Sequence, residues 1–250
     1  MRRLPNLPGL LVAAAILAIA VSGEAEAKRK VVVELYTSQG CDSCPPADAL
    51  LARLADRKDV LALSLPITYW DMLGWKDTLA SEGNTRRQKA YAAAMGRGGI
   101  YTPQMIIDGT SDVVGSREAQ VEAAIAARMA DMREIPVTLR TTPDTLHIVI
   151  GPGAARSGTD ATVWLFYILS RTSVHIAGGE NQGRSVTYRN VVRDVRAIAV
   201  WKGQALSLDL PRHDLIGPPH DAVAVVLQER GYGRVIGEAS LGPPEFGSPP

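Results

Sequence analysis

Apolar positions in the first half of the chain follow two different periods. Residues 31–36 (VVVELY) and 60–67 (VLALSLPI) are nearly continuous apolar runs, and both predict buried strands. Between the two runs, apolar residues recur at the spacing of one helix face: Ala47, Leu50, Leu51, Leu54 and Ala55. The pattern therefore predicts a strand, an amphipathic helix and a second strand.

A helix, a hairpin and another helix are predicted in the next 70 or so residues. Thr85 and Gln88 form a capping-box pair that would open the first of these helices. Residues 104–114 predict the hairpin, and Ser116 can cap the amphipathic helix that follows it. The predicted order before Pro136 is β-α-β-α-β-β-α.

From Pro136 onward the pattern changes to short β-rich runs separated by turns. Seven runs predict strands: 137–140, 145–150, 161–170, 185–192, 205–210, 222–228 and 234–239. Alternating apolar and polar positions, as in residues 206–210 (LSLDL), are typical of an antiparallel sandwich. We therefore expect an α/β domain over residues 28–133, an all-β, sandwich-like domain over 134–241, and a disordered tail over 242–250.

The N-terminus has the order of a secretory signal peptide over residues 1–27. Arg2 and Arg3 precede an apolar stretch at residues 10–21, and residues 25–27 (AEA) supply an A-x-A cleavage site. The apolar stretch is too short to span a bilayer, which takes about 20 residues. We therefore expect a periplasmic or secreted protein without stable membrane insertion, in a compartment where disulfides form.

Charge and composition exclude several kinds of partner. The 27 Lys and Arg residues balance 26 Asp and Glu residues, so a net charge of +1 gives no field that would attract nucleic acid. The four histidines show no ligand spacing, and two cysteines cannot build a four-thiolate site. We expect no zinc site, and no dissociable organic cofactor is implied.

The two cysteines, Cys41 and Cys44, lie three positions apart, between the first predicted strand and the first predicted helix. A bridge across so short a loop adds only about 2 kcal/mol in the chain-entropy model, so it is a poor structural staple. Unpaired N–H groups and the positive end of the helix dipole stabilise a thiolate at a helix start. The C-x-x-C pair therefore favours thiol–disulfide exchange, with Cu(I) handling by two soft thiolates and a redox-silent, partner-binding protein as the alternatives.

Several motifs together resemble one protein family. They are residues 34–48 (ELYTSQGCDSCPPAD), 69–71 (YWD), 73–75 (LGW), 101–104 (YTPQ), 114–116 (VGS) and, in the β-rich half, 179–181 (GEN). The chain resembles an exported proteobacterial family with a thioredoxin-like fold, catalogued as a domain of unknown function. The resemblance spans about residues 30–240. It implies a fold and a location, whereas it implies no substrate.

The resemblance to thioredoxins also implies roles for residues outside the cysteine pair. Thr102-Pro103 matches the cis-proline that thioredoxins place beside their cysteines, where neighbouring backbone groups pair with a substrate. A buried acid on the first strand is matched in type by Glu34, which would accept a proton from Cys44.

Two loops and one helix face carry further candidates. Trp70 and Trp75 lie in an aromatic and acidic loop that would either hold a peptide or small thiol near Cys41 or form a packed cap. Residues 178–184 predict a hairpin loop that can fold back over Cys41. The basic residues at positions 86, 87 and 89 are typical of a solvated helix face.

The sequence therefore predicts an exported thioredoxin-like thiol–disulfide oxidoreductase. Cys41 would attack a substrate disulfide and Cys44 would resolve the mixed disulfide. The expected partner is a protein or small-molecule thiol or disulfide.

Overall fold

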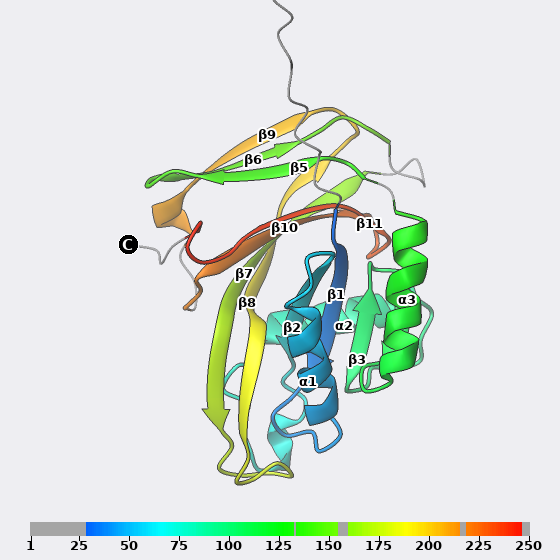
Figure 1. Cartoon of the computed structure of the whole chain (residues 1–250), viewed down its shortest axis with the longest axis vertical. Coiled ribbons are helices and arrows are strands. Elements are labelled where there is room, and N and C mark those ends of the chain that lie inside the picture. The colour runs from blue at the N-terminus through cyan, green and yellow to red at the C-terminus, as the bar shows by residue number, and fades with distance from the viewer. Residues whose placement is uncertain (1–28, 133, 155–159, 216–218, 247–250) are drawn as a thin grey trace, which may run out of the picture.

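Strands from both halves of the chain hydrogen-bond into one eight-stranded sheet, in the order β11-β10-β7-β8-β2-β1-β3-β4 (Figure 1). The computed structural model describes residues 29–132, 134–154, 160–215 and 219–246. The strands of this sheet are β1 (Val31–Thr37), β2 (Val60–Pro66), β3 (Gln104–Ile107), β4 (Ser111–Val114), β7 (Ala161–His175), β8 (Ser185–Trp201), β10 (Ala222–Glu229) and β11 (Val235–Leu241). The expected signal peptide lies outside the described residues.

In the part of the chain that the structure describes, three α-helices cover the two faces of the sheet around β1. They are α1 (Pro45–Leu54), α2 (Glu82–Ala94) and α3 (Glu118–Ala130), and two single 3-10 turns, η1 (Asp71–Leu73) and η2 (Arg212–Asp214), lie in loops. Val31, Val33 and Leu35 share one cluster with α1 and α3, whereas Val32 and Tyr36 share another with α2. Because successive strand side chains point to opposite faces, β1 is buried on both sides, as its unbroken apolar run predicts.

Helix α2 begins earlier than the capping-box pair predicts. The hydroxyl of Ser81 caps it by accepting a hydrogen bond from the Asn84 N–H at 3.1 Å. Thr85 and Gln88 therefore lie inside the helix, where Thr85 Oγ1 accepts from the Thr68 N–H at 3.0 Å and Gln88 Nε2 donates to Gln104 Oε1 at 2.8 Å.

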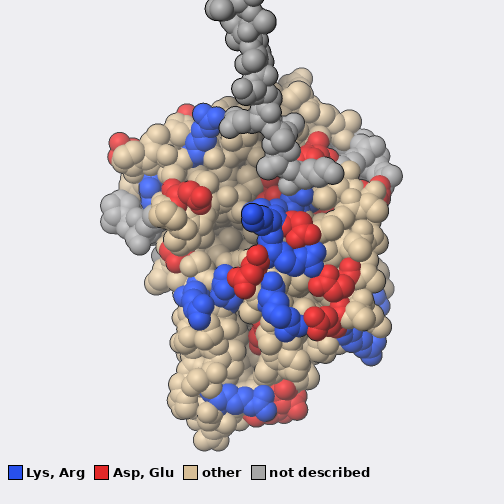
Figure 2. Space-filling model, viewed as in Figure 1, with Lys and Arg blue, Asp and Glu red and all other residues tan. Residues whose placement is uncertain are grey.

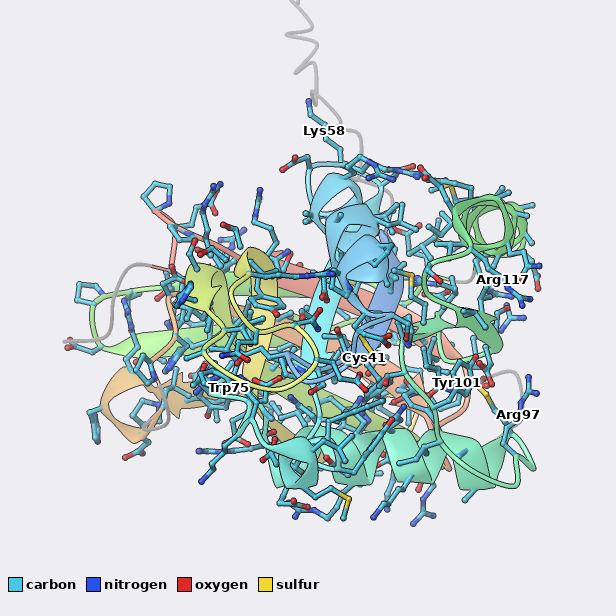
Figure 3. The ribbon with its side chains drawn as sticks, turned by 90° about the horizontal axis from the view of Figure 1, so that it is seen from below. Cys41, Lys58, Trp75, Arg97, Tyr101 and Arg117 are labelled. Atoms are coloured by element: carbon cyan, nitrogen blue, oxygen red, sulfur yellow. A yellow bond between two sulfur atoms is a disulfide. The ribbon has the colours of Figure 1, made fainter. Side chains whose placement is uncertain are left out.

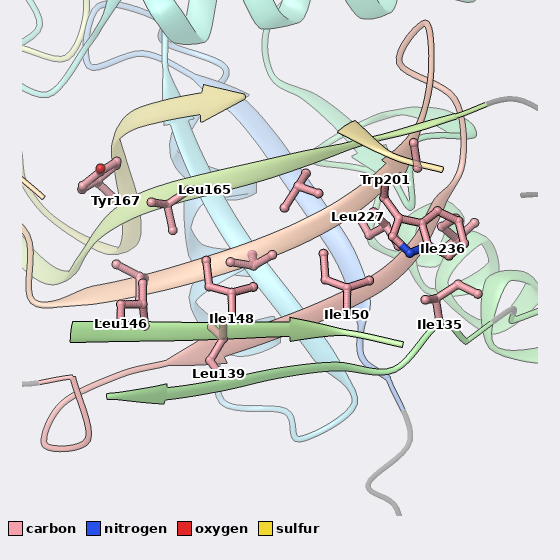
Figure 4. Close-up of a cluster of buried hydrophobic side chains, with 14 of the residues drawn as sticks. Ile135, Leu139, Leu146, Ile148, Ile150, Leu165, Tyr167, Trp201, Leu227 and Ile236 are labelled. Atoms are coloured by element: carbon pink, nitrogen blue, oxygen red, sulfur yellow. The ribbon is translucent and has the colours of Figure 1, made fainter. Parts of the chain in front are cut away.

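A second, three-stranded sheet packs against the β-rich part of the large one. It contains β5 (Val137–Thr141), β6 (Thr145–Ile150) and β9 (Leu206–Pro211), all antiparallel. Its inward residues, among them Leu146 and Ile148, meet Leu165 of β7 and Leu227 of β10 in one buried cluster (Figure 4). The strands predicted after Pro136 are thus confirmed one by one.

The expected fold class, an α/β thioredoxin-like domain followed by a separate all-β sandwich, is wrong. The strands of the β-rich half join the first-half sheet where β8 pairs in parallel with β2, at Ser64 and Val191. One hydrophobic cluster contains Leu63 and Tyr91 from the first half together with Phe166 and Val226 from the second. Among the described residues, strands contain more of the chain than helices do, and the two halves share a core.

The run Ala222–Leu227 explains the error. Its odd-numbered residues face the three-stranded sheet and its even-numbered residues belong to the cluster with α2. A strand buried on both faces is a central strand, and its continuous apolar sequence already differs from the alternation typical of a half-exposed sandwich strand. The tail differs in part as well, because Phe246 is buried and its N–H donates to Gly242 O at 2.9 Å; residues 247–250 lie outside the described residues.

Charged groups of both signs are interspersed on the face shown in Figure 2. Two ion pairs link α1 and the residues after it to α3, Arg53 with Glu118 and Arg57 with Glu122, each at 2.8 Å. These groups are substantially exposed, so each pair stabilises the fold by less than about 1 kcal/mol.

Candidate functional site: a buried disulfide at the start of a helix

Cys41 and Cys44 form a disulfide at the junction between β1 and α1. Cys44 occupies the N-cap of α1, and prolines follow at the first two helical positions, where a missing N–H costs nothing. The chain turns tightly here, since the Cys44 N–H donates to Cys41 O at 3.2 Å. Both cysteines are 0 % exposed, although Asp42 and Ser43 between them are exposed.

Two hydroxyl groups lie against the sulfur of Cys41. Thr102 Oγ1 donates to Cys41 Sγ at 3.4 Å, and Ser43 Oγ lies 3.4 Å from the same atom. A disulfide sulfur carries no proton, so the Ser43 hydroxyl is also the donor. Trp70 Nε1 donates to Thr102 Oγ1 at 2.8 Å and thereby aims the Thr102 hydroxyl at the sulfur. Within the described part of the chain, no such donor reaches Cys44 Sγ, so the two sulfurs have different surroundings.

Pro103 follows Thr102 directly, and the peptide bond between them is cis, as the resemblance implies. The Pro103 carbonyl accepts from the Gly115 N–H at 2.9 Å, which fixes this segment to the end of β4. Thr102, Pro103, Trp70 and Cys41 are therefore brought to one place from three separate segments of the sequence.

Trp75 contacts the cysteine loop through the side chain of Gln39 and not through a cysteine sulfur. Its Nε1 donates to Gln39 Oε1 at 2.8 Å, while the Gln39 N–H donates to Asp77 Oδ2 at 2.8 Å. Met72 and Leu73, in the same loop, are 84 % and 51 % exposed. The aromatic loop thus both packs against the cysteine loop and presents apolar side chains to solvent.

The structure does not bring Glu34 to the cysteines. Its carboxylate forms a bidentate ion pair with Arg87, at 2.6 Å to Nε and 2.9 Å to Nη2, and accepts from Tyr91 Oη at 2.6 Å. These partners belong to α2, whereas the cysteines begin α1 on the opposite face of β1. Arg87 is 2 % exposed, so the expectation of a solvated basic face holds for Arg86 and Lys89 only.

A different acid, Asp48, lies on the cysteine side of the sheet. It is the fourth residue after Cys44 on α1, and residues four apart on a helix share a face. The side chain is buried, and its Oδ1 has no hydrogen-bond partner among the described residues. Burial raises the pKa of Asp48 to about 8, the nearby Asp77 carboxylate adds to the rise, and the Thr37 hydroxyl opposes it.

Sequence reasoning missed Asp48, although a signal was present. The residue borders the apolar stripe of this helix, next to Ala55, where a solvated acid is less expected than on the opposite face. Asp77 and Tyr188 share its surroundings: burial raises the pKa of both, and the Asp48 and Asp77 charges raise that of Tyr188 further.

The tip of the long β7–β8 hairpin, residues 176–184, closes the site from another side. Asn181 Nδ2 donates to Gln39 O at 3.0 Å and to Cys41 O at 2.7 Å, and Glu180 Oε2 accepts from the Asp42 N–H at 3.2 Å. Figure 3 shows this loop between Trp75 and Cys41. The predicted fold-back of the 178–184 loop is thus present.

Two features, a cluster of metal-ligand side chains and a helix suited to span a membrane, are absent from the described residues. No group of three or more His, Cys, Asp or Glu side chains there is arranged to hold a metal ion. Among the same residues, no helix has both the length and the apolar character needed to cross a membrane.

Fold and site together define a protein built mainly on a mixed eight-stranded β-sheet, with a C-x-x-C disulfide buried at a strand–helix junction. The chain belongs to the family described as "Protein of unknown function (DUF1223)", which matches residues 32–228. The resemblance to a family of unknown function is thereby confirmed.

Two solved structures are similar to the chain. Protein AGR_C_4864 from Agrobacterium tumefaciens is 33 % identical, with a TM-score of 0.75 over 85 % of this chain and 94 % of that one. HBP35 of Porphyromonas gingivalis is 13 % identical, with a TM-score of 0.61 over 86 % of this chain and 75 % of that one, a likeness of fold alone. No curated protein matches the chain.

Proposed function

We propose that this protein is a thiol–disulfide oxidoreductase with Cys41 as the nucleophile and Cys44 as the resolving cysteine. The observation that carries the proposal is the pair of hydroxyl groups, from Thr102 and Ser43, 3.4 Å from Cys41 Sγ. Donors aimed at a sulfur stabilise the thiolate that forms there when the disulfide opens, and hydrogen bonds to charged groups are the strong ones. The start of α1 adds the positive end of its dipole.

In the oxidising direction, a substrate thiolate attacks Cys41 Sγ. The Cys41–Cys44 bond breaks, a mixed disulfide forms, and Cys44 leaves as a thiolate. A second substrate thiolate then attacks the substrate sulfur of the mixed disulfide and releases Cys41. Two electrons pass from the substrate dithiol to the protein disulfide. The reducing direction is the reverse of these steps.

Asp48 is the proton acceptor and donor that this cycle offers to Cys44. With a pKa of about 8, its carboxyl group exists in both protonation states near neutral pH. It can take the proton when the Cys44 thiol turns into the attacking thiolate, and return it when Cys44 leaves. Glu34 has no such freedom, because its oxygens are held by Arg87 and Tyr91.

A redox-silent, structural disulfide is the second candidate, and one observation favours it. Both cysteines are 0 % exposed, so no thiol reaches either sulfur without a movement of the surrounding loops. The two candidates differ in the ease with which the disulfide is reduced.

Trapping experiments separate the candidates. Cys44→Ser leaves the attacking thiolate but removes resolution, so the variant should accumulate mixed disulfides through Cys41, whereas Cys41→Ser should not. The measurement is mass spectrometry of protein incubated under mildly oxidising conditions. Equal trapping by both variants would contradict the assigned order of the two cysteines. No trapping by either variant, together with a disulfide that glutathione does not reduce, would leave the redox-silent disulfide as the function.

Export and the partner complete the proposal. A basic start, an apolar stretch and an A-x-A site in residues 1–27 support secretion into an oxidising compartment. The partner is a protein or small molecule carrying a thiol or disulfide. Sequencing the N-terminus of the protein recovered from the cell envelope or medium tests the cleavage site after Ala27.

A further inference from the structure

The disulfide is closed off by groups that do not belong to its own loop. The cysteine loop alone leaves Asp42 and Ser43 exposed, yet both cysteines are 0 % exposed. The tip of the β7–β8 hairpin contributes to this closure, because it touches the backbone on both sides of Cys41. A thiol can attack Cys41 only after some of these groups move.

Asn181 makes the central contact of the tip. Its side chain is 1 % exposed, and one amide nitrogen donates to two carbonyls of the cysteine loop, those of Gln39 and Cys41. A buried amide whose donor serves two acceptors holds the two segments together, since separating them leaves both carbonyls without this donor. Glu180, next to it, adds a weaker and exposed contact to the Asp42 N–H at 3.2 Å.

Two glycines allow the tip to approach this closely. A Cβ at Gly178 would lie 3.1 Å from Gly74 O, and one at Gly179 would lie 3.0 Å from Trp75 Cβ. Gly179 also has a φ of 72°, which other residues rarely adopt. The sequence of the tip is therefore fitted to the loop that carries Trp75.

The hairpin can release the tip without breaking the large sheet. Pairing of β7 with β10 ends at Ile168, so the last seven residues of β7 pair with β8 alone. The side chains of this segment pack in a small cluster around Leu79, Tyr188 and Val191. A two-stranded segment with so small a core opens at a lower free energy than the eight-stranded body. Movement of the tip is thus separable from unfolding.

We propose that Asn181 is a positioning residue that holds the β7–β8 tip over the Cys41–Cys44 disulfide, so that release of its two hydrogen bonds admits a thiol to Cys41. The inference rests on the proposed function for its biological meaning. Its physical content, access of a thiol to a buried disulfide, is measurable without any natural substrate.

The test is reduction of the oxidised full-length protein by dithiothreitol, quenched by alkylation and followed by mass spectrometry. One thiolate of the reagent attacks Cys41 Sγ and Cys44 leaves; the second thiol closes the oxidised ring and releases Cys41. Asn181→Ala should be reduced at least tenfold faster than the unaltered protein. The equilibrium with dithiothreitol should change by less than threefold, because the tip controls access and not the stability of the bond.

Gln182→Ala is the matched control. Gln182 carries the same amide group on the same tip, but its side chain is exposed, so its removal should change the rate by less than twofold. Glu180→Ala removes the exposed contact and should raise the rate two- to threefold. If Asn181→Ala does not fold, as judged by circular dichroism, Asn181→Asp replaces the donor with acceptors at equal size and should be reduced at least tenfold faster.

Two results would overturn the proposal. The first is that the folded variants Asn181→Ala, Asn181→Asp and Glu180→Ala are all reduced at rates within twofold of the rate for the unaltered protein. The second is a faster reduction rate accompanied by an equally large change in the equilibrium constant with dithiothreitol. Asn181 would then act on the stability of the disulfide and not on access to it. Neither result depends on trapping by Cys44→Ser, so failure of the proposed function and failure of this inference are distinguishable.

Discussion

Glu34 of β1 and Arg87 of α2 form a bidentate ion pair with both side chains 2 % exposed or less. Gln228 of β10 accepts from the same Arg87 Nη2 at 3.2 Å and donates to Tyr91 Oη at 2.8 Å. The Arg87 guanidinium also lies about 5 Å from the ring centres of Trp164 and Phe166. This cluster therefore joins the first strand, a helix and the β-rich half.

Removing one member of the pair should destabilise the fold without altering sulfur chemistry. Glu34→Gln leaves the Arg87 charge buried and unpaired, and such losses cost about 3–5 kcal/mol. Denaturant unfolding measures the change, with Arg53→Ala as the control, since its pair with Glu118 is exposed and should cost less than about 1 kcal/mol. Folded Glu34→Gln should react with dithiothreitol at the unaltered rate. A slower, pH-shifted reaction would restore Glu34 as the proton acceptor.

The sequence predicted the elements better than their assembly. The strands of the second half and the β-α-β-α-β-β-α order of the first were readable because each element carries its own periodicity. The pairing of β2 with β8 could not be predicted from the sequence, because it rests on a single bridge between residues more than a hundred positions apart. Likewise, Thr102 and Trp70 could be named from motifs, and the 178–184 loop could be expected to fold back over Cys41. The hydrogen bonds of Asn181 could not be predicted, because their acceptors are backbone carbonyls, which have no signature in sequence.

Asp48 should make the fold less stable as pH rises. Its pKa is about 8 in the folded protein and about 3.9 in an unfolded chain, so between these values the folded state holds a proton that the unfolded state lacks. The stabilisation is complete below about pH 4 and is lost as pH rises through 8, a total of at most about 6 kcal/mol.

Asp48→Asn removes this titration. The variant should gain stability over the unaltered protein between pH 5 and pH 8.5, measured as the difference in urea midpoint at each pH. Glu238, whose pKa is also raised by burial, titrates in both proteins and cancels in the comparison. Asp77 interacts electrostatically with Asp48, so its titration is part of the measured difference. A difference that stays constant with pH would show that Asp48 is ionised throughout.

The same substitution should slow thiol–disulfide exchange. In the unaltered protein, Cys44 should resolve a mixed disulfide at Cys41 faster as pH rises, because Asp48 becomes ionised and can take the proton of the Cys44 thiol. Asp48→Asn should slow resolution about tenfold at neutral pH. A positioned proton-transfer group typically contributes about 10²–10⁴-fold, and the loss is smaller here because water replaces the carboxyl group in part. Stopped-flow measurement of mixed-disulfide decay reports the step. An unaltered rate and pH profile would remove Asp48 from the cycle.

Thr102 should control the reactivity of Cys41. Thr102→Val keeps the shape but removes the hydroxyl that donates to Sγ, and a hydrogen bond to a charged sulfur stabilises it by about 1.5–3 kcal/mol. Alkylation of reduced Cys41 by iodoacetamide at neutral pH should slow about tenfold or more. Thr102→Ser retains the hydroxyl and serves as the control. Equal rates for the two variants would mean that Ser43 alone supplies the donor.

The shared cluster around Arg87 has a practical consequence for anyone mapping this protein by random mutagenesis. Gln228 lies near the end of the chain, yet its amide holds the helix that packs on β1, the strand leading directly into the cysteine loop. A screen for loss of the proposed exchange activity will therefore return β10 changes alongside cysteine changes. The amount of folded protein recovered from each clone will distinguish substitutions that destabilise the fold from substitutions that disable the cysteine pair.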